Sequence, residues 1–146
     1  MADDTARVEG PDAELMDGLV QAAFAITSVL NRVGARHELS LTQLRVLGIL
    51  RDRRLGVTEL ARHLGLDKST ISGLLDRAGK RGLVERGADP GDGRVVRVTL
   101  SEQGHHLAES IRVEVADLLA PFVDNLTRSE QGRMRALLAR MGAGVL

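Results

Sequence analysis

The chain has 146 residues, enough for one domain or for a small module that gains a core by dimerising. It contains no cysteine, which excludes disulfides, thiolate metal ligands and thiol-based redox sensing, and its 43% hydrophobic content is typical of a folded protein. The formal net charge is zero, but residues 1–20 carry six acids and one base, whereas residues 51–100 carry eleven bases and seven acids. Either ordinary solvated faces or a nucleic-acid partner would explain this basic middle.

The first segment, residues 1–12, is polar and acidic, and we expect a flexible tail there. It has neither the basic start nor the apolar run of a signal peptide, and no run of 18 apolar residues occurs in the chain, so we expect a cytoplasmic protein with no membrane partner. Over residues 13–36, apolar residues recur at helical spacing, which predicts one long amphipathic helix. They include Leu15, Leu19, Ala23, Ile26 and Leu30.

A second helix is predicted to begin after Ser40, because Ser40 and Gln43 have the spacing of a capping box. Its apolar residues Leu44, Leu47 and Leu50 should point inward. The basic run of residues 51–54 should close it, since positive charge is favoured at a helix C-terminus.

Residues 57–75 read VTELARHLGLDKSTISGLL, the pattern of two short helices joined by a tight turn. Ala61 is small where the helices would cross, and Gly65 stands where the turn requires a positive φ. Thr58 and Asp67 are the predicted N-caps of the two helices. The pattern predicts a helix-turn-helix, whose second helix enters the DNA major groove.

After Gly82 the apolar pattern changes to period two, which predicts paired strands at residues 83–86 and 95–100 around a turn-rich tip. A hairpin directly after a helix-turn-helix is a wing.

A long helix should follow Ser101, with Pro121 kinking it or loosening its last turns. A capping box at residues 127–130 predicts the start of a final helix.

The predicted fold class is therefore mainly α with a small β-hairpin wing. Residues 38–101 form a winged helix-turn-helix, and residues 13–37 and 102–146 form a helical dimerisation region. The apolar stripes of the terminal helices have no obvious partner in so small a winged core, so we expect a twofold homodimer. An intramolecular helical bundle is the alternative.

Several segments occur here in an order that resembles one family. They are LTQLRVL at 41–47, LARHLGL at 60–66, LLDR at 74–77, RGLVER at 81–86, DPGDGR at 89–94 and VTLSEQG at 98–104. With them, residues 15–142 resemble the MarR family, the winged-helix regulators of multiple antibiotic resistance in bacteria. The wing is similar to that family's Asp-x-Arg-Asp-x-Arg signature followed by Leu-Thr-x-x-Gly. Gly91 replaces the first wing arginine, and Gly73 stands where a larger polar or basic residue is common, so DNA affinity should weaken or base preference shift.

The resemblance implies a sequence-specific regulator of transcription, a homodimeric repressor of double-stranded DNA with a pseudo-palindromic operator. In the recognition helix, Ser69, Thr70 and Ser72 would face base edges, and Lys68 and Arg77 would face phosphates. Capping and solvation are the alternative roles of these hydroxyls. In the wing, Arg94 would enter the minor groove, and the resemblance implies that Asp92 holds it there; an exposed ion pair is the alternative. Arg97 completes the predicted DNA-binding set.

Members of this family often release DNA when a small phenolic or other aromatic acid lodges between the dimerisation helices and the DNA-binding lobe. Arg36, His37 and Arg45 are the nearest cationic candidates here, with ordinary junction residues as the alternative. We expect no cofactor. A metal site of His37, His63, His105 and His106 is conceivable, but we expect none, because the adjacent His105 and His106 would point to different faces of a helix. No nucleophile–base pair, GxGxxG or P-loop indicates an enzyme. A ligand-independent regulator, and a winged-helix module that binds protein instead of DNA, remain alternatives.

Overall fold

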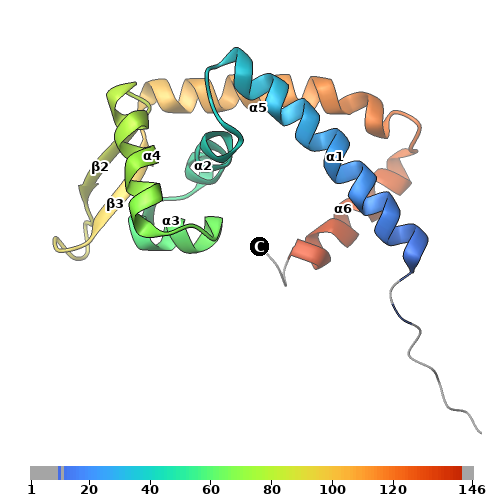
Figure 1. The fold of residues 1–146 in the computed structure, drawn as a ribbon, viewed down its shortest axis with the longest axis horizontal. Coiled ribbons are helices and arrows are strands. Elements are labelled where there is room, and N and C mark those ends of the chain that lie inside the picture. Colours follow the sequence, from blue (N-terminus) through green and yellow to red (C-terminus); the bar gives the residue numbers. More distant parts are fainter. Residues whose placement is uncertain (1–9, 11, 143–146) are drawn as a thin grey trace, which may run out of the picture.

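The computed structural model describes residues 10 and 12–142, so the predicted flexible tail lies outside the described residues except for Gly10 and Asp12. In chain order the elements are α1 (Ala13–Arg36), α2 (Leu41–Asp52), β1 (Leu55–Gly56), α3 (Val57–Leu64), α4 (Lys68–Lys80), β2 (Val84–Ala88), β3 (Val96–Leu100), α5 (Glu102–Val123) and α6 (Arg128–Gly142). Figure 1 shows α5 running from the sheet at one end to α6 at the other, with α1 beside it.

The core is aliphatic and lies where α2, α3, α4 and the sheet meet the last turns of α1 and the first half of α5. Its largest fully buried side chains are Leu50, Leu60, Ile71, Leu75, Val33 and Val98. Each such side chain contributes about 1.5–3 kcal/mol relative to an exposed position. The inward orientation predicted for Leu44, Leu47 and Leu50 of α2 is confirmed, and so is the capping box of Ser40 and Gln43.

The predicted helix-turn-helix is present as α3 and α4, which pack against each other. Gly65 ends α3 with a φ of 64°, and Asp67 caps α4, as expected. The predicted N-cap of α3 is wrong: α3 begins at Val57, Gly56 is its N-cap, and Thr58 lies inside the first turn. The reason is that Leu55 and Gly56 form β1, so the chain passes directly from a strand into the helix.

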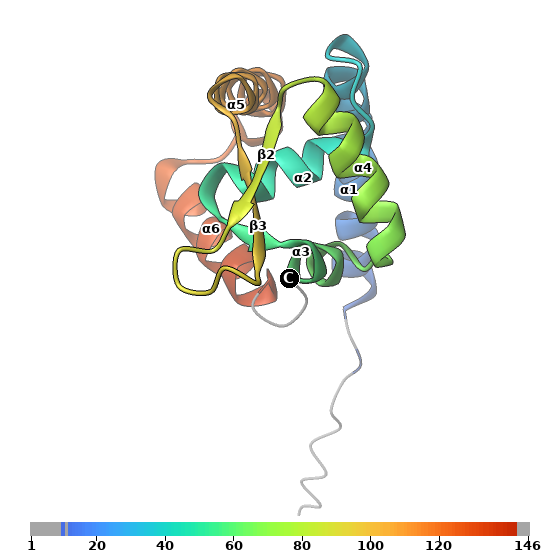
Figure 2. The same ribbon diagram turned by 90° about the vertical axis from the view of Figure 1, so that its left-hand side faces the viewer.

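The strands form one antiparallel sheet in the order β1-β3-β2. In Figure 2, β2 and β3 face the viewer with α4 to their right. The predicted hairpin is confirmed, with Val84 opposite Leu100 and Ala88 opposite Val96. The third strand, β1, was not predicted; its Leu55 pairs with Val98 in the middle of the sheet. The sheet thereby fixes the base of the wing to the start of α3.

The first turn of α5 packs closely on the end of the loop that follows α4. Ser101 caps α5 by accepting from the backbone N–H of Gly104, and its hydroxyl donates to the carbonyl of Gly82. A Cβ added at Gly104 would lie 2.0 Å from the carbonyl oxygen of Leu83, so glycine is required there. At its other end α5 stops at Val123, two residues after Pro121, and the predicted capping box then opens α6.

The terminal helices leave large apolar side chains exposed. Phe24 in α1 is 70% exposed and Leu137 in α6 is 53% exposed, and no described residue of α6 is buried. The other exposed apolar residues of these helices include Leu15, Met16, Val20, Met134, Leu138 and Met141. Within one copy of the chain, the predicted stripes therefore stay largely uncovered.

Among the described residues, α1 is long and apolar enough to cross a membrane by length and composition. One such helix does not by itself show a membrane span, because a helix of a soluble protein can meet the same criterion. The expectation counted uninterrupted apolar runs, whereas residues 18–31 of α1 mix apolar and small polar residues without any charge. The helix nevertheless packs its last turns into the core through Val29 and Val33.

Candidate nucleic-acid interface

The first turn of α4 gathers three of the predicted DNA-binding residues on an exposed surface. Lys68, Ser69 and Thr70 are all exposed. The carboxylate of Asp67 accepts from the Ser69 hydroxyl, from the Thr70 backbone N–H at 2.8 Å and from Thr70 Oγ1 at 2.7 Å. These bonds, that from Ser69 first, hold the pKa of Asp67 far below its usual range. The N-cap therefore fixes both hydroxyls in place.

The remaining predicted residues of α4 are less uniformly placed. Ser72 is half-buried, and its carbonyl accepts from Arg86 of β2, which also pairs with Asp76 at 2.9 Å. Arg77 is exposed. A Cβ at Gly73 would lie 3.7 Å from its guanidinium Nη1, so Arg77 lies over the surface that a larger side chain at 73 would occupy.

The wing tip is organised by two aspartates. Asp89 accepts from the backbone N–H of Gly91 at 2.7 Å, and a Cβ at Gly91 would lie 3.3 Å from the same oxygen. A larger side chain at position 91 would require the Asp89 carboxylate to shift by a few tenths of an ångström. Asp92 accepts from the backbone N–H of Arg94 at 3.1 Å. The expected hold of Asp92 on Arg94 is thus made through the main chain, and the structure records no ion pair between their side chains.

Arg97 does not project freely toward solvent. Its Nε donates to Asp89 at 2.6 Å and its Nη1 donates to Glu59 of α3 at 2.8 Å. The guanidinium lowers the pKa of Asp89, and this hydrogen bond in turn raises the pKa of Arg97. Arg97 was predicted to contact DNA together with the other basic side chains. Its bond to Glu59 could not be predicted, because Glu59 lies 38 positions away in the sequence.

A groove of about 440 Å³ separates the wing from the first turns of α3 and α4. Its lining includes three cationic side chains, Lys68, Arg86 and Arg94, which come from the recognition helix, β2 and the wing. Gly56, Val57, Thr58, Glu59, Val95 and Val96 line the rest. The groove thus brings Lys68 and Arg94, predicted to contact DNA, to the two sides of one channel.

Comparison with known proteins supports the same interpretation. A model described as "MarR family" matches residues 37–95. The transcriptional repressor YetL of Bacillus subtilis strain 168 is 30% identical over 133 residues, which cover 89% of this chain and 80% of YetL. The chain belongs to the MarR family. It is a DNA-binding regulator of transcription with a winged helix-turn-helix fold.

Two solved MarR-family structures resemble the chain along most of its length. A mutant MarR from E. coli in complex with operator DNA is 27% identical with a TM-score of 0.67, over 88% of this chain and 94% of that one. NadR in complex with 4-hydroxyphenylacetate is 26% identical with a TM-score of 0.75, over 91% of this chain and 95% of that one.

The three predicted effector residues of this MarR-family chain have two different sets of hydrogen-bond partners. Arg36 and His37, at the end of α1, both donate to the carboxylate of Glu114 in α5. Arg45 instead donates to the carbonyl of His63, at the end of α3, over 3.2 Å. Glu114 was not predicted. Its sequence signal is an acid beside the apolar stripe of α5, which alone does not identify a partner.

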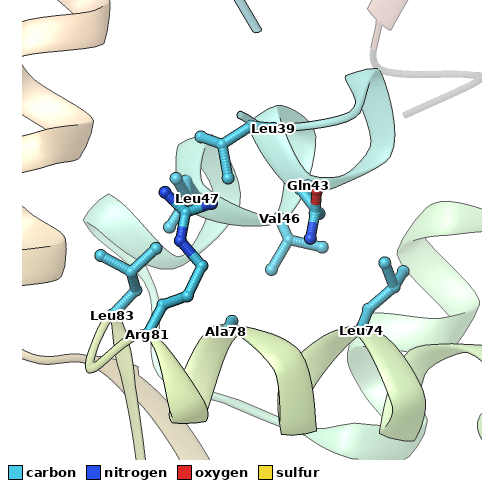
Figure 3. A pocket seen from close by; sticks show the side chains of 8 residues that line it. All are labelled: Leu39, Gln43, Val46, Leu47, Leu74, Ala78, Arg81 and Leu83. Carbon is cyan, nitrogen blue, oxygen red and sulfur yellow. The ribbon is translucent and has the colours of Figure 1, made fainter. Parts of the chain in front are cut away.

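The cavities offer different amounts of room. The space between α2 and α4, lined by Leu39, Gln43, Val46, Leu47, Leu74, Ala78, Arg81 and Leu83, has a volume of only about 10 Å³ (Figure 3). It is too small for more than one water molecule. A hollow of about 390 Å³ lies beside Arg45 and His63, between α2 and the end of α3. In the described part of the chain, no three His, Asp or Glu side chains are placed to hold a metal ion.

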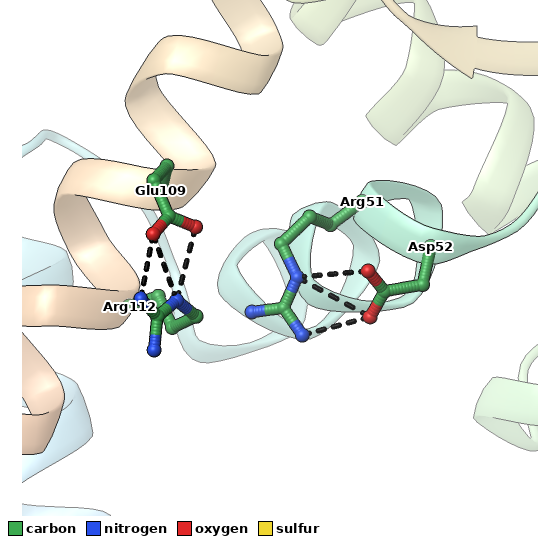
Figure 4. A network of polar contacts seen from close by, with 4 residues as sticks. All are labelled: Arg51, Asp52, Glu109 and Arg112. Carbon is green, nitrogen blue, oxygen red and sulfur yellow. Dashed lines mark hydrogen bonds and ion pairs between the residues drawn. The ribbon is translucent and has the colours of Figure 1, made fainter.

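The arginines where α2 faces α5 are paired locally. Arg51 donates to Asp52, with Nη2 at 2.7 Å, and Arg112 donates to Glu109, with Nη2 at 2.6 Å (Figure 4). Each guanidinium is held by a carboxylate of its own helix. The charges of Arg51 and Arg112 are therefore neutralised by neighbouring carboxylates, unlike those of Lys68 and Arg94 in the groove.

Proposed function

We propose that the protein is a homodimeric repressor that binds a pseudo-palindromic operator, with α4 in the major groove and the wing in the adjacent minor groove. The observation that carries the proposal is the exposed first turn of α4, where Asp67 fixes the hydroxyls of Ser69 and Thr70. This turn lies beside the groove lined by Lys68, Arg86 and Arg94, called the cationic groove below. Lys68 and Arg77 are assigned to phosphates and Arg94 to the minor groove, where negative potential attracts a guanidinium. Asp92 shapes the turn that presents Arg94.

The bonding of the two hydroxyls favours particular bases. A hydroxyl has one proton, and those of Ser69 and Thr70 donate theirs to Asp67, which leaves their lone pairs to accept. The donors in the major groove are the amino groups of adenine and cytosine, and thymine offers a methyl group that the Thr70 methyl can contact. We therefore assign this turn to edges of adenine, cytosine or thymine. The two acceptors of guanine would need a different partner.

The terminal helices are assigned to dimerisation, as residues 13–37 and 102–142 of the described chain. The support is the exposed apolar surface of α1 and α6, in which Phe24 is 70% and Leu137 is 53% exposed. Monomeric soluble proteins rarely leave a large contiguous apolar surface open to water. A second copy would cover this surface and place two recognition helices about one DNA turn apart, roughly 34–36 Å. The same use accounts for the apolar composition of α1 without a membrane.

We assign the effector to the class of aromatic or phenolic carboxylic acids. Arg36 and His37 already hold one carboxylate, that of Glu114, where α1 meets α5. An acid that replaced Glu114 on these cations would loosen α1 from α5 and alter the spacing of the two recognition helices. Arg45 would pass such a change to the helix-turn-helix through its bond to the end of α3. The complex of NadR with 4-hydroxyphenylacetate supports this chemical class.

Selection of bound sites from a random DNA pool, with and without 4-hydroxyphenylacetate, tests the proposal. We expect an enriched inverted repeat, and we expect the acid to reduce its recovery. Enrichment that the acid leaves unchanged would favour a ligand-independent regulator. A pool that stays random would favour a winged-helix module that binds protein.

We place the protein in the cytoplasm, where the bacterial chromosome lies, and assign it no catalytic role, since its relatives are transcription regulators.

A further inference from the structure

We propose that Arg97 is a positioning residue that fixes the wing against α3, and that the acid Glu59 therefore strengthens DNA binding. Arg97, Asp89 and Glu59 are called the Arg97 cluster below. The inference rests on the proposed use of the wing and α4 on DNA. It concerns how the free protein holds these two parts in one arrangement.

The Arg97 cluster joins three segments that are distant in the sequence. Arg97 lies in β3, Asp89 directly follows β2, and Glu59 lies in the first turn of α3. The guanidinium uses Nε for Asp89 at 2.6 Å and Nη1 for Glu59 at 2.8 Å, so one planar group bridges two carboxylates. The Asp89 side chain is 20% exposed and that of Arg97 is 32% exposed, which limits the screening of their bond by water.

Each carboxylate is also tied to its own segment. Asp89 accepts from the backbone N–H of Gly91, and its own N–H donates to the carbonyl of Val95 at 2.8 Å, so it closes the loop at the wing tip. Glu59 lies close to β1: a Cβ at Gly56 would be 3.5 Å from Glu59 Oε1 and 3.6 Å from the carbonyl oxygen of Val96. A bond through Arg97 therefore couples the wing tip to the start of α3.

Other parts of the wing tip supply little packing to replace this coupling. From residue 85 to residue 96 every side chain is exposed except that of Asp89. The cationic groove runs between this tip and the first turns of α3 and α4, with Arg94 on the wing side and Lys68 on the helix side. The relative position of these two cations therefore depends on the Arg97 cluster.

The proposal and simple electrostatics predict opposite effects of the Glu59 charge on affinity for DNA. A carboxylate that lines a groove for a phosphate backbone repels DNA, so removing its charge should tighten binding if Arg97 and Glu59 act only as charges. If the Arg97 cluster sets the wing, removing the charge of Glu59 releases one arm of the guanidinium and weakens binding. The direction of one measured change thus distinguishes a positioning role from a purely electrostatic one.

The test compares Glu59→Gln, Arg97→Ala and their combination with the control Glu85→Gln, which removes a charge from an exposed position of β2 outside the cluster. The readouts are affinity for the selected operator over a salt series and hydrogen exchange of the free protein. We expect Glu59→Gln and Arg97→Ala each to weaken binding by about tenfold, with no further loss in the double variant. The control should bind unchanged or slightly tighter.

Salt dependence and exchange separate this role from a phosphate contact and from loss of folding. We expect the slope of log affinity against log salt to stay unchanged in both single variants, since loss of a phosphate contact lowers its magnitude by about 1. In the free protein the amides of residues 89 and 91–96 should exchange faster while those of α2 stay protected. This readout needs no DNA, so it tests the proposal separately from the proposed function. Tighter binding by Glu59→Gln, additive losses, or unchanged exchange at the wing would overturn the proposal.

Discussion

His37, the residue that follows α1, donates from Nε2 to Oε2 of Glu114 in α5 over a distance of 2.8 Å. Arg36 donates to the other oxygen of the same carboxylate. These bonds, that of His37 first, hold the pKa of Glu114 below its usual range. The junction between α1 and α5 therefore depends on an ionised carboxylate.

The depressed pKa of Glu114 predicts how this junction responds to acid. Because the folded pKa lies below the unfolded one, the stabilisation is fully present above about pH 5 and is lost as pH falls through the folded pKa. The free-energy difference of unfolding between the wild type and Glu114→Gln should therefore be constant from about pH 5 to 6 and should shrink toward pH 3. Chemical denaturation at each pH measures it. A difference that stays constant down to pH 3 would show that the ionised carboxylate of Glu114 does not stabilise the junction.

The wing prediction concerns Arg94, an exposed side chain on one side of the cationic groove. Arg94→Ala should weaken operator binding by about tenfold or more and lower the magnitude of the salt slope by about 1, because one phosphate-adjacent cation is lost. Arg133→Ala, in α6, is the matched control and should change neither quantity. Fluorescence anisotropy over a salt series measures both. An unchanged affinity of Arg94→Ala would show that the wing does not contact the duplex.

The dimer prediction concerns the exposed apolar face of α6. Leu137→Glu should shift the protein from twice the chain mass toward the 15.7 kDa of one chain at micromolar concentration, because a buried unpaired charge opposes association. Ala136→Glu adds the same charge one position away, outside the apolar stripe of Met134, Leu137, Leu138 and Met141, and should leave the mass unchanged. Light scattering or sedimentation measures the mass. If both variants keep the wild-type mass, α6 is not part of the interface.

Two glycines give a matched pair of stability predictions. Gly104→Ala should destabilise by about 1–3 kcal/mol or more, because its Cβ would lie 2.0 Å from the carbonyl oxygen of Leu83 and backbone cannot move aside cheaply. Gly48→Ala, in the middle of α2, meets no atom within 4 Å and should stabilise by about 0.4–1 kcal/mol. Denaturant titration compares the two. Equal effects would mean that the close approach of α5 to Leu83 is absent in solution.

The features of the fold that have a local cause could be predicted from the sequence. The capping box of Ser40 and Gln43, the positive φ of Gly65 and the N-cap at Asp67 each depend on residues within about one helical turn. Hydrophobic periodicity likewise placed the long helices and the hairpin. The exposed stripes of α1 and α6 followed from the same pattern, because nothing else in a small winged core is available to cover them.

The features that depend on a partner distant in the sequence could not be predicted. Thr58 has the chemistry of an N-cap, but pairing of Leu55 with Val98 makes the preceding residues a strand and moves the cap to Gly56. Arg97 reads as one more base in a basic segment until folding brings Glu59 beside it. Glu114 meets Arg36 in the same way across 78 positions, and no local pattern marks either pairing.

The central claim is that two copies of α4 read the bases of a DNA duplex. The base preference of two Thr70 variants tests it most directly. Thr70→Ser keeps the hydroxyl and loses the methyl group, and Thr70→Val does the reverse. Affinities are measured over an operator changed one base pair at a time. If α4 reads the duplex in two copies, each variant relaxes discrimination, by about 1–3 kcal/mol, at one base pair in each half-site, and non-specific affinity is unchanged. Wild-type discrimination at every position in both variants would contradict the claim.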